Sequence, residues 1–237
     1  MENDWQSFWV RYRNIPPVEE SDLFYQVGKT VDKAPISIDE FSSMIKNIVE
    51  SLDLDKDDIL LELCCGNGLL TYLLSNFTKH IYAFDFAKHM IENAKKFKQK
   101  ENITYAVGDA KSNFFKLFGE NPNPGKILMN DSLAYFSYED LASIITLLIN
   151  KIENFSFYIT GIPCEELKWE FYNTDERKKA YLSDVERGDL YNNGMGRWWS
   201  VDEIEQLAKK FNLRYLIEKP SKFYNYRMNV LLTQTPN

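Results

Sequence analysis

Three acidic residues and one turn of small residues are the groups in this chain whose types and spacing point to chemistry. Glu62 follows the apolar run Ile59–Leu61 and leads into the small residues Cys64–Gly68. Asp85 follows a second apolar run and Asp109 follows a third, so each acid stands where a strand is expected to end. A glycine-rich turn lets a ligand lie close to bare backbone, and carboxylates accept hydrogen bonds from hydroxyl groups. The pattern indicates a site of the kind in which α/β nucleotide-binding folds hold ribose hydroxyls.

Ordinary structural roles and other nucleotide motifs fit these residues less well. Acids occur anywhere on a surface, and glycine is common in ordinary strand-to-helix turns, but acids after three successive strands favour a ligand site. The dinucleotide motif G-x-G-x-x-G fails in both registers, because its third glycine would be Thr71 if it began at Gly66, and its first is Cys64 in the other register. Gly28–Thr30 has the end of a phosphate-binding loop, but Leu23 stands where that motif needs glycine.

The elements that must position these residues alternate between strand and helix. Apolar runs bounded by turn residues predict strands near 58–63, 80–85, 103–107, 126–131 and 155–161, with helices near 68–78, 87–99, 111–118 and 138–151. Such alternation predicts a mainly parallel sheet with helices on both faces. Capping boxes at Ser37–Glu40 and Ser200–Glu203 predict the starts of two more helices, and two further strands follow near 213–218 and 226–233.

Taken in order, the three loops resemble the motifs of class I S-adenosylmethionine-dependent methyltransferases. Glu62–Gly68 is similar to their glycine-rich first motif, Asp85–Met90 to their second and Gly108–Ala110 to their third. The resemblance extends over roughly residues 37–237. One departure is Cys64 in place of the family's first glycine, because cysteine is small but lacks glycine's backbone freedom.

The resemblance implies a Rossmann-like α/β fold, with a mainly parallel seven-stranded sheet whose last strand is antiparallel. It implies a single methyltransferase domain over 1–237. Within it we expect an N-terminal helical cap (1–55), a cofactor-binding α/β core (56–162), a lid insertion (163–200) and a closing helix and β-hairpin (201–237).

The resemblance also implies S-adenosylmethionine as cofactor and S-adenosylhomocysteine as product. The methionine part of the cofactor would lie on the loop residues Glu62, Cys64, Gly66, Asn67 and Gly68. Asp85 would bind the ribose hydroxyls, and Phe86 would pack on the adenine face. Asp109 would accept a hydrogen bond from the adenine amino group, with Ala110 beside it. Asn130 would face the methionine amino group or the acceptor.

The acceptor side is expected at the end of the fourth predicted strand. Asp131 is the first candidate for a general base, with Tyr135 as a second; the alternative for Asp131 is a helix or turn cap. The aromatic segment 163–200 is either a substrate lid or an insertion that packs its own rings. The candidates for binding the acceptor are Tyr25, Lys29, Tyr172, Tyr191 and Arg197.

Composition limits the partners. A net charge of −7 and a pI of about 5.1 argue against a broad nucleic-acid surface or anionic-membrane surface. The longest apolar run, Ala142–Ile149, is too short to span a bilayer. Three cysteines and two histidines lack zinc-site spacing. We therefore expect a cytoplasmic protein that acts on a small molecule, without nucleic acid, membrane or metal.

Methyl transfer from a sulfonium needs positioning, exclusion of water and, for a hydroxyl acceptor, removal of a proton. The segments Gln26–Thr30, Pro35–Ser37 and Leu61–Leu74 are similar to those of methyltransferases from bacterial surface-polysaccharide gene clusters. This resemblance implies methylation of a hydroxyl or amine on a small polar acceptor such as a sugar, a nucleotide-sugar or a related precursor. The alternative is a catalytically inactive cofactor-binding partner or regulatory subunit, because no histidine base is recognisable.

Overall fold

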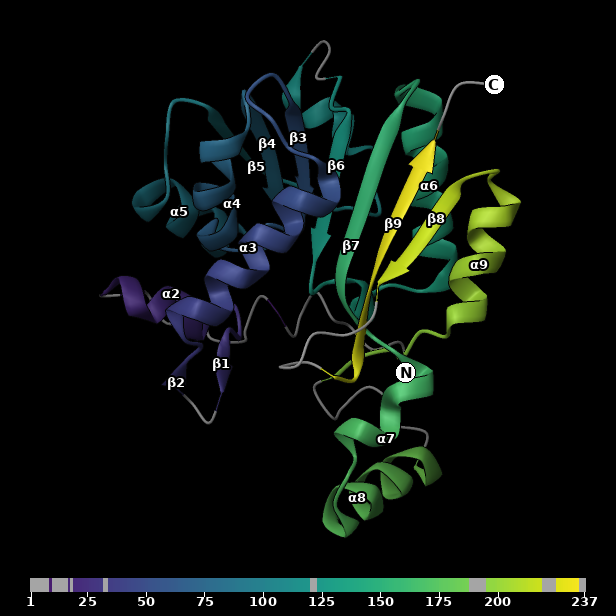
Figure 1. Ribbon diagram of the computed structural model, residues 1–237. Helices are drawn as coiled ribbons and strands as arrows, with labels where there is room; N and C mark the ends of the chain where they lie inside the picture. The colour runs from purple at the N-terminus through teal and green to yellow at the C-terminus, as the bar shows by residue number, and fades with distance from the viewer. Residues whose placement is uncertain are drawn as a thin grey trace. The chain divides into compact units, whose positions relative to one another are not determined.

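The computed structural model describes residues 9, 17, 19–31, 34–119, 123–187, 195–218 and 225–234. The described strands form a small sheet of β1 (Thr30–Val31) and β2 (Ala34–Pro35), and a seven-stranded sheet of order β5-β4-β3-β6-β7-β9-β8 (Figure 1). The strands of the large sheet are β3 Ile59–Leu63, β4 His80–Asp85, β5 Ile103–Val107, β6 Lys126–Asn130, β7 Phe155–Pro163, β8 Arg214–Glu218 and β9 Arg227–Gln234. β3 pairs in parallel with β4 and β6, and β4 with β5, whereas β8 and β9 are antiparallel. The predicted Rossmann-like fold is confirmed.

The chain divides into two compact units. The N-terminal unit holds residues 2–129 and 155–157, and the C-terminal unit holds 130–154 and 158–237. The single domain with four segments that we expect from the sequence stays a prediction.

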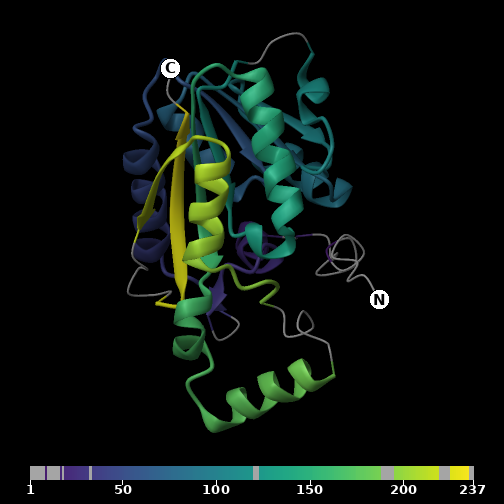
Figure 2. The same ribbon diagram turned by 90° about the vertical axis from the view of Figure 1, so that its right-hand side faces the viewer.

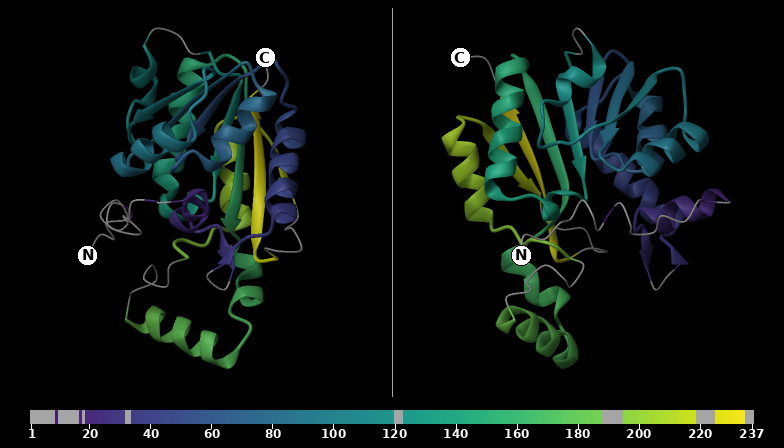
Figure 3. Two further views of the ribbon diagram at one scale, coloured as in Figure 1. Left: turned by 90° about the vertical axis from the view of Figure 1, so that its left-hand side faces the viewer. Right: turned by 180° about the vertical axis from the view of Figure 1, so that it is seen from behind.

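The N-terminal unit places helices α3, α4 and α5 on one face of β3–β5 (Figures 1 and 3). Its further elements are β1 Thr30–Val31, β2 Ala34–Pro35, α2 Glu20–Gln26, α3 Ile38–Leu52, α4 Leu69–Leu74, α5 Lys88–Phe97 and the 3₁₀ helices Ser75–Phe77 and Phe114–Phe118. The capping box predicted at the start of α3 is present, because the Ser37 hydroxyl accepts from Glu40 N at 3.2 Å and the Glu40 carboxylate from Ser37 N at 2.9 Å. The apolar stripe of α3 is buried as its spacing predicts: Phe41, Ile45, Ile48 and Leu52.

The helix predicted over 111–118 is wrong in type and length. The structure has only a 3₁₀ helix, Phe114–Phe118. Asp109 accepts hydrogen bonds from Lys111 N through its carboxylate and from the Ser112 hydroxyl through its carbonyl, at 2.9 and 2.8 Å. These local bonds give the backbone an alternative to the first helical turn.

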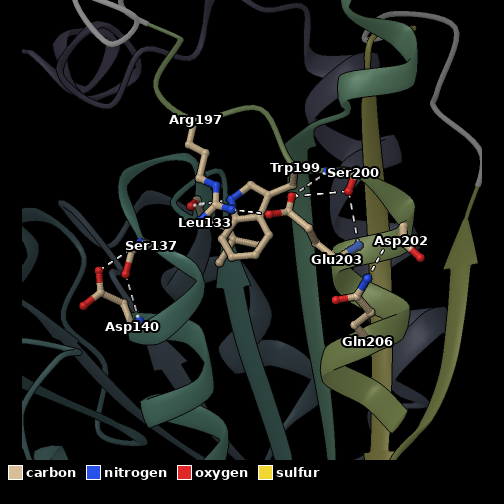
Figure 4. Close-up of polar contacts among 9 residues, drawn as sticks. All are labelled: Leu133, Ser137, Asp140, Arg197, Trp199, Ser200, Asp202, Glu203 and Gln206. Atoms are coloured by element: carbon tan, nitrogen blue, oxygen red, sulfur yellow. Dashed lines mark hydrogen bonds and ion pairs between the residues drawn. The ribbon is translucent and has the colours of Figure 1, made fainter. Parts of the chain in front are cut away.

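The C-terminal unit places α6 and α9 side by side beside the strands β8 and β9 (Figure 2). Its helices are α6 Tyr138–Lys151, α7 Lys168–Phe171, α8 Asp175–Glu186 and α9 Val201–Lys210, with 3₁₀ helices Leu133–Tyr135 and Glu165–Leu167. The capping box predicted at Ser200 opens α9, and a second one at Ser137 opens α6 (Figure 4). α8 buries none of its residues. Every helix among the described residues is too short or too polar to cross a lipid bilayer.

Candidate functional site

The loop after β3 is built from left-handed backbone. Cys64, Gly66 and Gly68 have φ values of 59°, 56° and 75°. A Cβ on Gly68 would lie 2.4 Å from the Tyr105 hydroxyl, so only glycine fits there. Cys64 is strained, because left-handed backbone is costly for residues with a side chain. The structure therefore keeps the turn at a small cost in strain.

Glu62 enters this loop from a buried position. Its side chain is 2% exposed, and burial raises its pKa to about 8; the Thr71 hydroxyl opposes this rise and Asp85 adds to it. Among the described residues no hydrogen-bond partner reaches Glu62 Oε2. A buried acceptor without a donor is costly. The position suits a ligand that brings a donor, such as an ammonium group.

Asp85 ties the end of β4 to the same loop. Its Oδ2 accepts from Gly66 N and its Oδ1 from Ala87 N, both at 2.9 Å. Burial raises the pKa of Asp85 to about 6, and the two backbone donors partly offset that rise. Each carboxylate oxygen can accept a second hydrogen bond, which is what a pair of ribose hydroxyls needs.

The third acid lies at the end of the next strand. Gly108 N donates to Asp85 O at 3.0 Å, which holds the ends of β5 and β4 together. Asp109 is half-buried, Ala110 is buried and Phe86 is half-buried. The parallel register of β3, β4 and β5 thus brings the three acids to one edge of the sheet, as predicted.

Helix α2, which lies within the segment 1–55 where we expect a helical cap, packs on the loop. Asn67 is fully buried and donates through Nδ2 to Leu23 O at 2.9 Å and to Gln26 Oε1 at 3.0 Å. A Cβ on Gly66 would lie 3.0 Å from the Val27 side chain. Asn93 of α5 also donates to Gln26 Oε1, at 3.2 Å. A helix as short as α2 leaves little hydrophobic periodicity in the sequence. Its position on the loop is therefore known only from these contacts.

The two N-terminal acceptor candidates differ in exposure. Lys29 is buried, with its Nζ 3.5 Å from the sulfur of Met44. Tyr25 is 47% exposed. The structure therefore places Lys29 inside the N-terminal unit and Tyr25 on its surface.

In the C-terminal unit, Asp131 forms an ion pair. Its Oδ1 lies 2.7 Å from Arg227 Nη1, and the same nitrogen donates to Gly161 O at 3.0 Å. Asp131 has a left-handed backbone, with φ 52°, and its N–H donates to Thr160 O at 3.0 Å. Asn130 Oδ1 accepts from the Thr160 hydroxyl at 2.8 Å. No motif in the sequence singles out Arg227, because its partner is far away along the chain.

Arg227 keeps its charge in this position. Burial lowers the pKa of Arg227, but Asp131, Tyr226 and Tyr135 outweigh it and the net shift is upward. Of the two predicted catalytic residues, Asp131 is thus held against Arg227, and Tyr135 lies in the 3₁₀ helix Leu133–Tyr135 that follows β6.

The segment 163–200 and Tyr226 together build an aromatic cluster, which we define by its rings in contact: Trp169, Phe171, Tyr172, Tyr181, Trp198 and Tyr226. Tyr172 lies at its centre, 4% exposed, and burial raises its pKa to about 12. Trp169 is 49% exposed at the rim. The described part of the segment thus packs its own rings, and Tyr191 lies outside the described residues.

Arg197 is held beside this cluster by structural contacts (Figure 4). Its guanidinium forms an ion pair with Glu203 and lies 4.2 Å from the ring centroid of Trp199. Trp199 is fully buried and donates through Nε1 to Leu133 O at 3.1 Å. These contacts fix the start of α9 against the segment after β6.

Among the described residues, no group of three or more His, Cys, Asp or Glu side chains could hold a metal ion.

The sequence matches one protein-family model over part of its length, and it is similar to curated proteins. The model of the family described as "Methyltransferase domain" matches residues 60–149. A probable cobalt-precorrin-6B C(15)-methyltransferase (decarboxylating) from Methanococcus vannielii is 34% identical over 90 residues, 35% of this chain and 48% of the relative. A protein of the same name from Methanococcus maripaludis is 29% identical over 121 residues, 47% of this chain and 62% of the relative. The matches thus span about half the length of these curated relatives.

Solved structures share the fold across nearly the whole chain. Magnesium protoporphyrin IX methyltransferase from Synechocystis PCC 6803, with bound S-adenosylhomocysteine, is 13% identical with a TM-score of 0.61, over 98% of this chain and 95% of that one. The putative methyltransferase from Haloferax volcanii, in complex with the activator Trm112, is 12% identical with a TM-score of 0.62, over all of both chains. The chain thus resembles a methyltransferase domain over residues 60–149, and it shares the fold of solved methyltransferases that bind S-adenosylmethionine or S-adenosylhomocysteine.

Proposed function

We propose that this protein transfers the methyl group of S-adenosylmethionine to a hydroxyl or amine of a small polar acceptor. The observation that carries the proposal is the edge where Glu62 and Asp85 flank a loop of left-handed backbone. The orphaned Glu62 Oε2 and the glycine-only position 68 fit a ligand that lies against bare backbone and brings its own donors.

The residues of the N-terminal unit have distinct roles in this proposal. Glu62 would receive the ammonium group of the methionine part, and Asp85 the two ribose hydroxyls. Phe86 would lie on the adenine face, and Asp109 would accept from the adenine amino group. S-adenosylmethionine supplies a methyl group activated by its positive sulfur, so these residues need only bind and orient it.

The acceptor side belongs to the C-terminal unit. Asp131 and Tyr135 are the proposed catalytic residues, because both lie just after β6 and Asp131 is held there by Arg227. Asp131 would take the proton of a hydroxyl acceptor, and Asn130 is fixed beside it by Thr160. The Arg227 guanidinium would hold the carboxylate in place.

For the acceptor, we propose a sugar, nucleotide-sugar or related surface-polysaccharide precursor. The aromatic cluster supports a ring-shaped acceptor, since aromatic faces pack on apolar ring faces while a tyrosine hydroxyl stays available for polar groups. A tetrapyrrole is the second candidate: relatives are named for corrin and porphyrin substrates, and the half-exposed ring of Trp169 suits a planar acceptor. The acceptor-binding roles of Tyr25, Lys29, Tyr172, Tyr191 and Arg197 remain part of the proposal.

Two measurements test the proposal. Calorimetry should show binding of S-adenosylhomocysteine and none of NAD. Turnover should then be measured with nucleotide-sugars and tetrapyrroles, using Tyr172→Ala, which should raise KM for the true acceptor. Binding without turnover on any acceptor would favour the alternative function, a catalytically inactive cofactor-binding partner. Binding of NAD in place of S-adenosylhomocysteine would overturn the proposal.

A further inference from the structure

Three side-chain amides join α2 to the cofactor loop, and their orientations are fixed. Asn67 donates to the carbonyl of Leu23 at 2.9 Å and accepts from the N–H of Leu69 at 3.3 Å. The Leu23 carbonyl can only accept and the Leu69 N–H can only donate. These two partners therefore fix the orientation of the Asn67 amide, with its nitrogen toward Leu23 and its oxygen toward Leu69. Gln26 must therefore turn its oxygen toward Asn67 Nδ2, and Asn93 donates to the same oxygen.

The side-chain nitrogen of Gln26 consequently faces away from these partners. Gln26 is 3% exposed, and among the described residues no acceptor reaches its Nε2. A buried donor without an acceptor penalises the docked position of α2. The penalty disappears if a ligand brings an oxygen to this point.

A second orphan lies at the same loop with the opposite chemistry. Glu62 Oε2 is a buried acceptor without a donor among the described residues, and Gln26 Nε2 is a buried donor without an acceptor. An amino acid in its zwitterionic form carries one ammonium donor and one carboxylate acceptor. The two orphans therefore match the two charged ends of the methionine part.

We propose that Gln26 Nε2 binds the α-carboxylate of the cofactor's amino-acid part, so that α2 is a cap whose docked position the cofactor stabilises. This rests on the proposed function, since it requires the cofactor to lie on the Glu62–Gly68 loop. It assigns a binding role to a residue outside the three sequence motifs. It also makes the helix part of the cofactor site.

The test compares two ligands that differ only in the carboxylate. Calorimetry measures S-adenosylhomocysteine and its decarboxylated analogue, which keeps the amine, against wild type and Gln26→Glu. Gln26→Glu keeps the oxygen for Asn67 and Asn93 but places a carboxylate where the donor was. This variant should bind S-adenosylhomocysteine about tenfold to a hundredfold more weakly than wild type does. Its affinity for the decarboxylated analogue should be unchanged or higher.

Two variants control for folding. Gln26→Met adds no charge but removes both the donor and the oxygen to which Asn67 and Asn93 donate, so it should loosen α2 and yet still weaken S-adenosylhomocysteine binding more than binding of the analogue. Ser21→Ala, on the exposed side of α2, should change neither affinity. Equal weakening of both ligands, or of neither, in Gln26→Glu and Gln26→Met would overturn the proposal. Failure of wild type to bind S-adenosylhomocysteine would instead overturn the proposed function.

Hydrogen exchange gives a readout of the cap itself. In wild type, saturating S-adenosylhomocysteine should slow exchange of the α2 amides, and the decarboxylated analogue should slow it less. In Gln26→Glu the difference between the ligands should vanish. Equal protection of α2 by both ligands in wild type would show that the carboxylate does not hold the helix.

Discussion

Arg227 and Asp131 are 96 positions apart in the chain, yet Arg227 Nη1 lies 2.7 Å from Asp131 Oδ1. The pair joins the start of β9 to the residue that follows β6. The side chains are 23% and 30% exposed, so water screens the pair only in part. Asp131 therefore has a structural role beside the catalytic role proposed for it.

A double-mutant cycle measures that structural role. We expect Asp131→Asn and Arg227→Gln to couple by about 1–3 kcal/mol in the free energy of unfolding, because truncating either partner leaves the other charge half-buried. Denaturant unfolding of both single variants and the double variant gives the value. The exposed pair Lys46–Glu50, 74% and 64% exposed on α3, is the control and should couple by under about 0.5 kcal/mol. Equal coupling energies for Asp131–Arg227 and Lys46–Glu50 would refute the structural role of Asp131.

Gly161 leaves room for Asp131. A Cβ at Gly161, which has φ 69°, would lie 1.7 Å from Asp131 Oδ1. Gly161→Ala should therefore destabilise the protein by about 2–4 kcal/mol through backbone strain and displacement of the carboxylate. Gly119→Ala is the control for strain alone, since Gly119 has φ 75° and ψ −158°, a region that essentially only glycine adopts, with nothing within 4 Å of its Cβ position; it should cost about 1–3 kcal/mol. Thermal or chemical unfolding compares the two; similar losses would mean that the carboxylate moves aside freely.

Cofactor binding should be linked to the proton on Glu62. The pKa of Glu62 is raised to about 8 in the ligand-free protein, so at pH 7 the group is mostly protonated. A bound ammonium favours the charged form, so binding releases a proton and affinity should rise between pH 6 and 8, at most about tenfold per pH unit. Calorimetry in buffers of different ionisation enthalpy counts the proton. Glu62→Gln should flatten the dependence, and a pH-independent wild type would contradict the linkage.

The same raised pKa predicts the sign of a stability effect. Folding favours the protonated form, so the contribution of Glu62 is fully present below pH 4.5 and is lost as pH rises through about 8. Ligand-free wild type should therefore lose stability across this window relative to Glu62→Gln, as denaturant unfolding at a series of pH values would measure.

Asp85→Ala should weaken the binding of S-adenosylhomocysteine at least tenfold. Hydrogen bonds to a charged acceptor contribute about 1.5–3 kcal/mol each, and two ribose hydroxyls would lose theirs. Glu153→Ala removes an exposed acid and should leave the affinity unchanged. Because Asp85 also accepts from Gly66 N and Ala87 N, circular dichroism must first show that the variant is folded. If the folded variant bound S-adenosylhomocysteine with wild-type affinity, Asp85 would not bind the ribose hydroxyls and would serve only to hold the loop.

The fold and the sheet edge that carries Glu62 and Asp85 could be predicted from the sequence because their signals are local. Apolar runs marked β3, β4 and β5, and Ser37 and Ser200 marked helix starts through bonds only three residues long. Glu62 and Asp85 could be placed because strand ends in a parallel sheet share an edge.

The remaining features depend on contacts that are distant in the chain. Arg227 meets Asp131 only after the sheet has formed, and Gln26 meets Asn67 across 41 positions. The 111–118 helix failed for a local reason, since Asp109 competes for the backbone donors that would start it. Tyr191 lies outside the described residues, and its role stays a prediction.

The left-handed Cys64 makes the loop chemically addressable. Cys65 and Cys164 are buried, and burial raises the pKa of each thiol, so both resist alkylation at neutral pH. Cys64 is only half-buried and lies in the left-handed turn after β3. It thus gives the protein a native labelling site at that turn, and the rate at which a maleimide modifies it would report whether a ligand covers the turn.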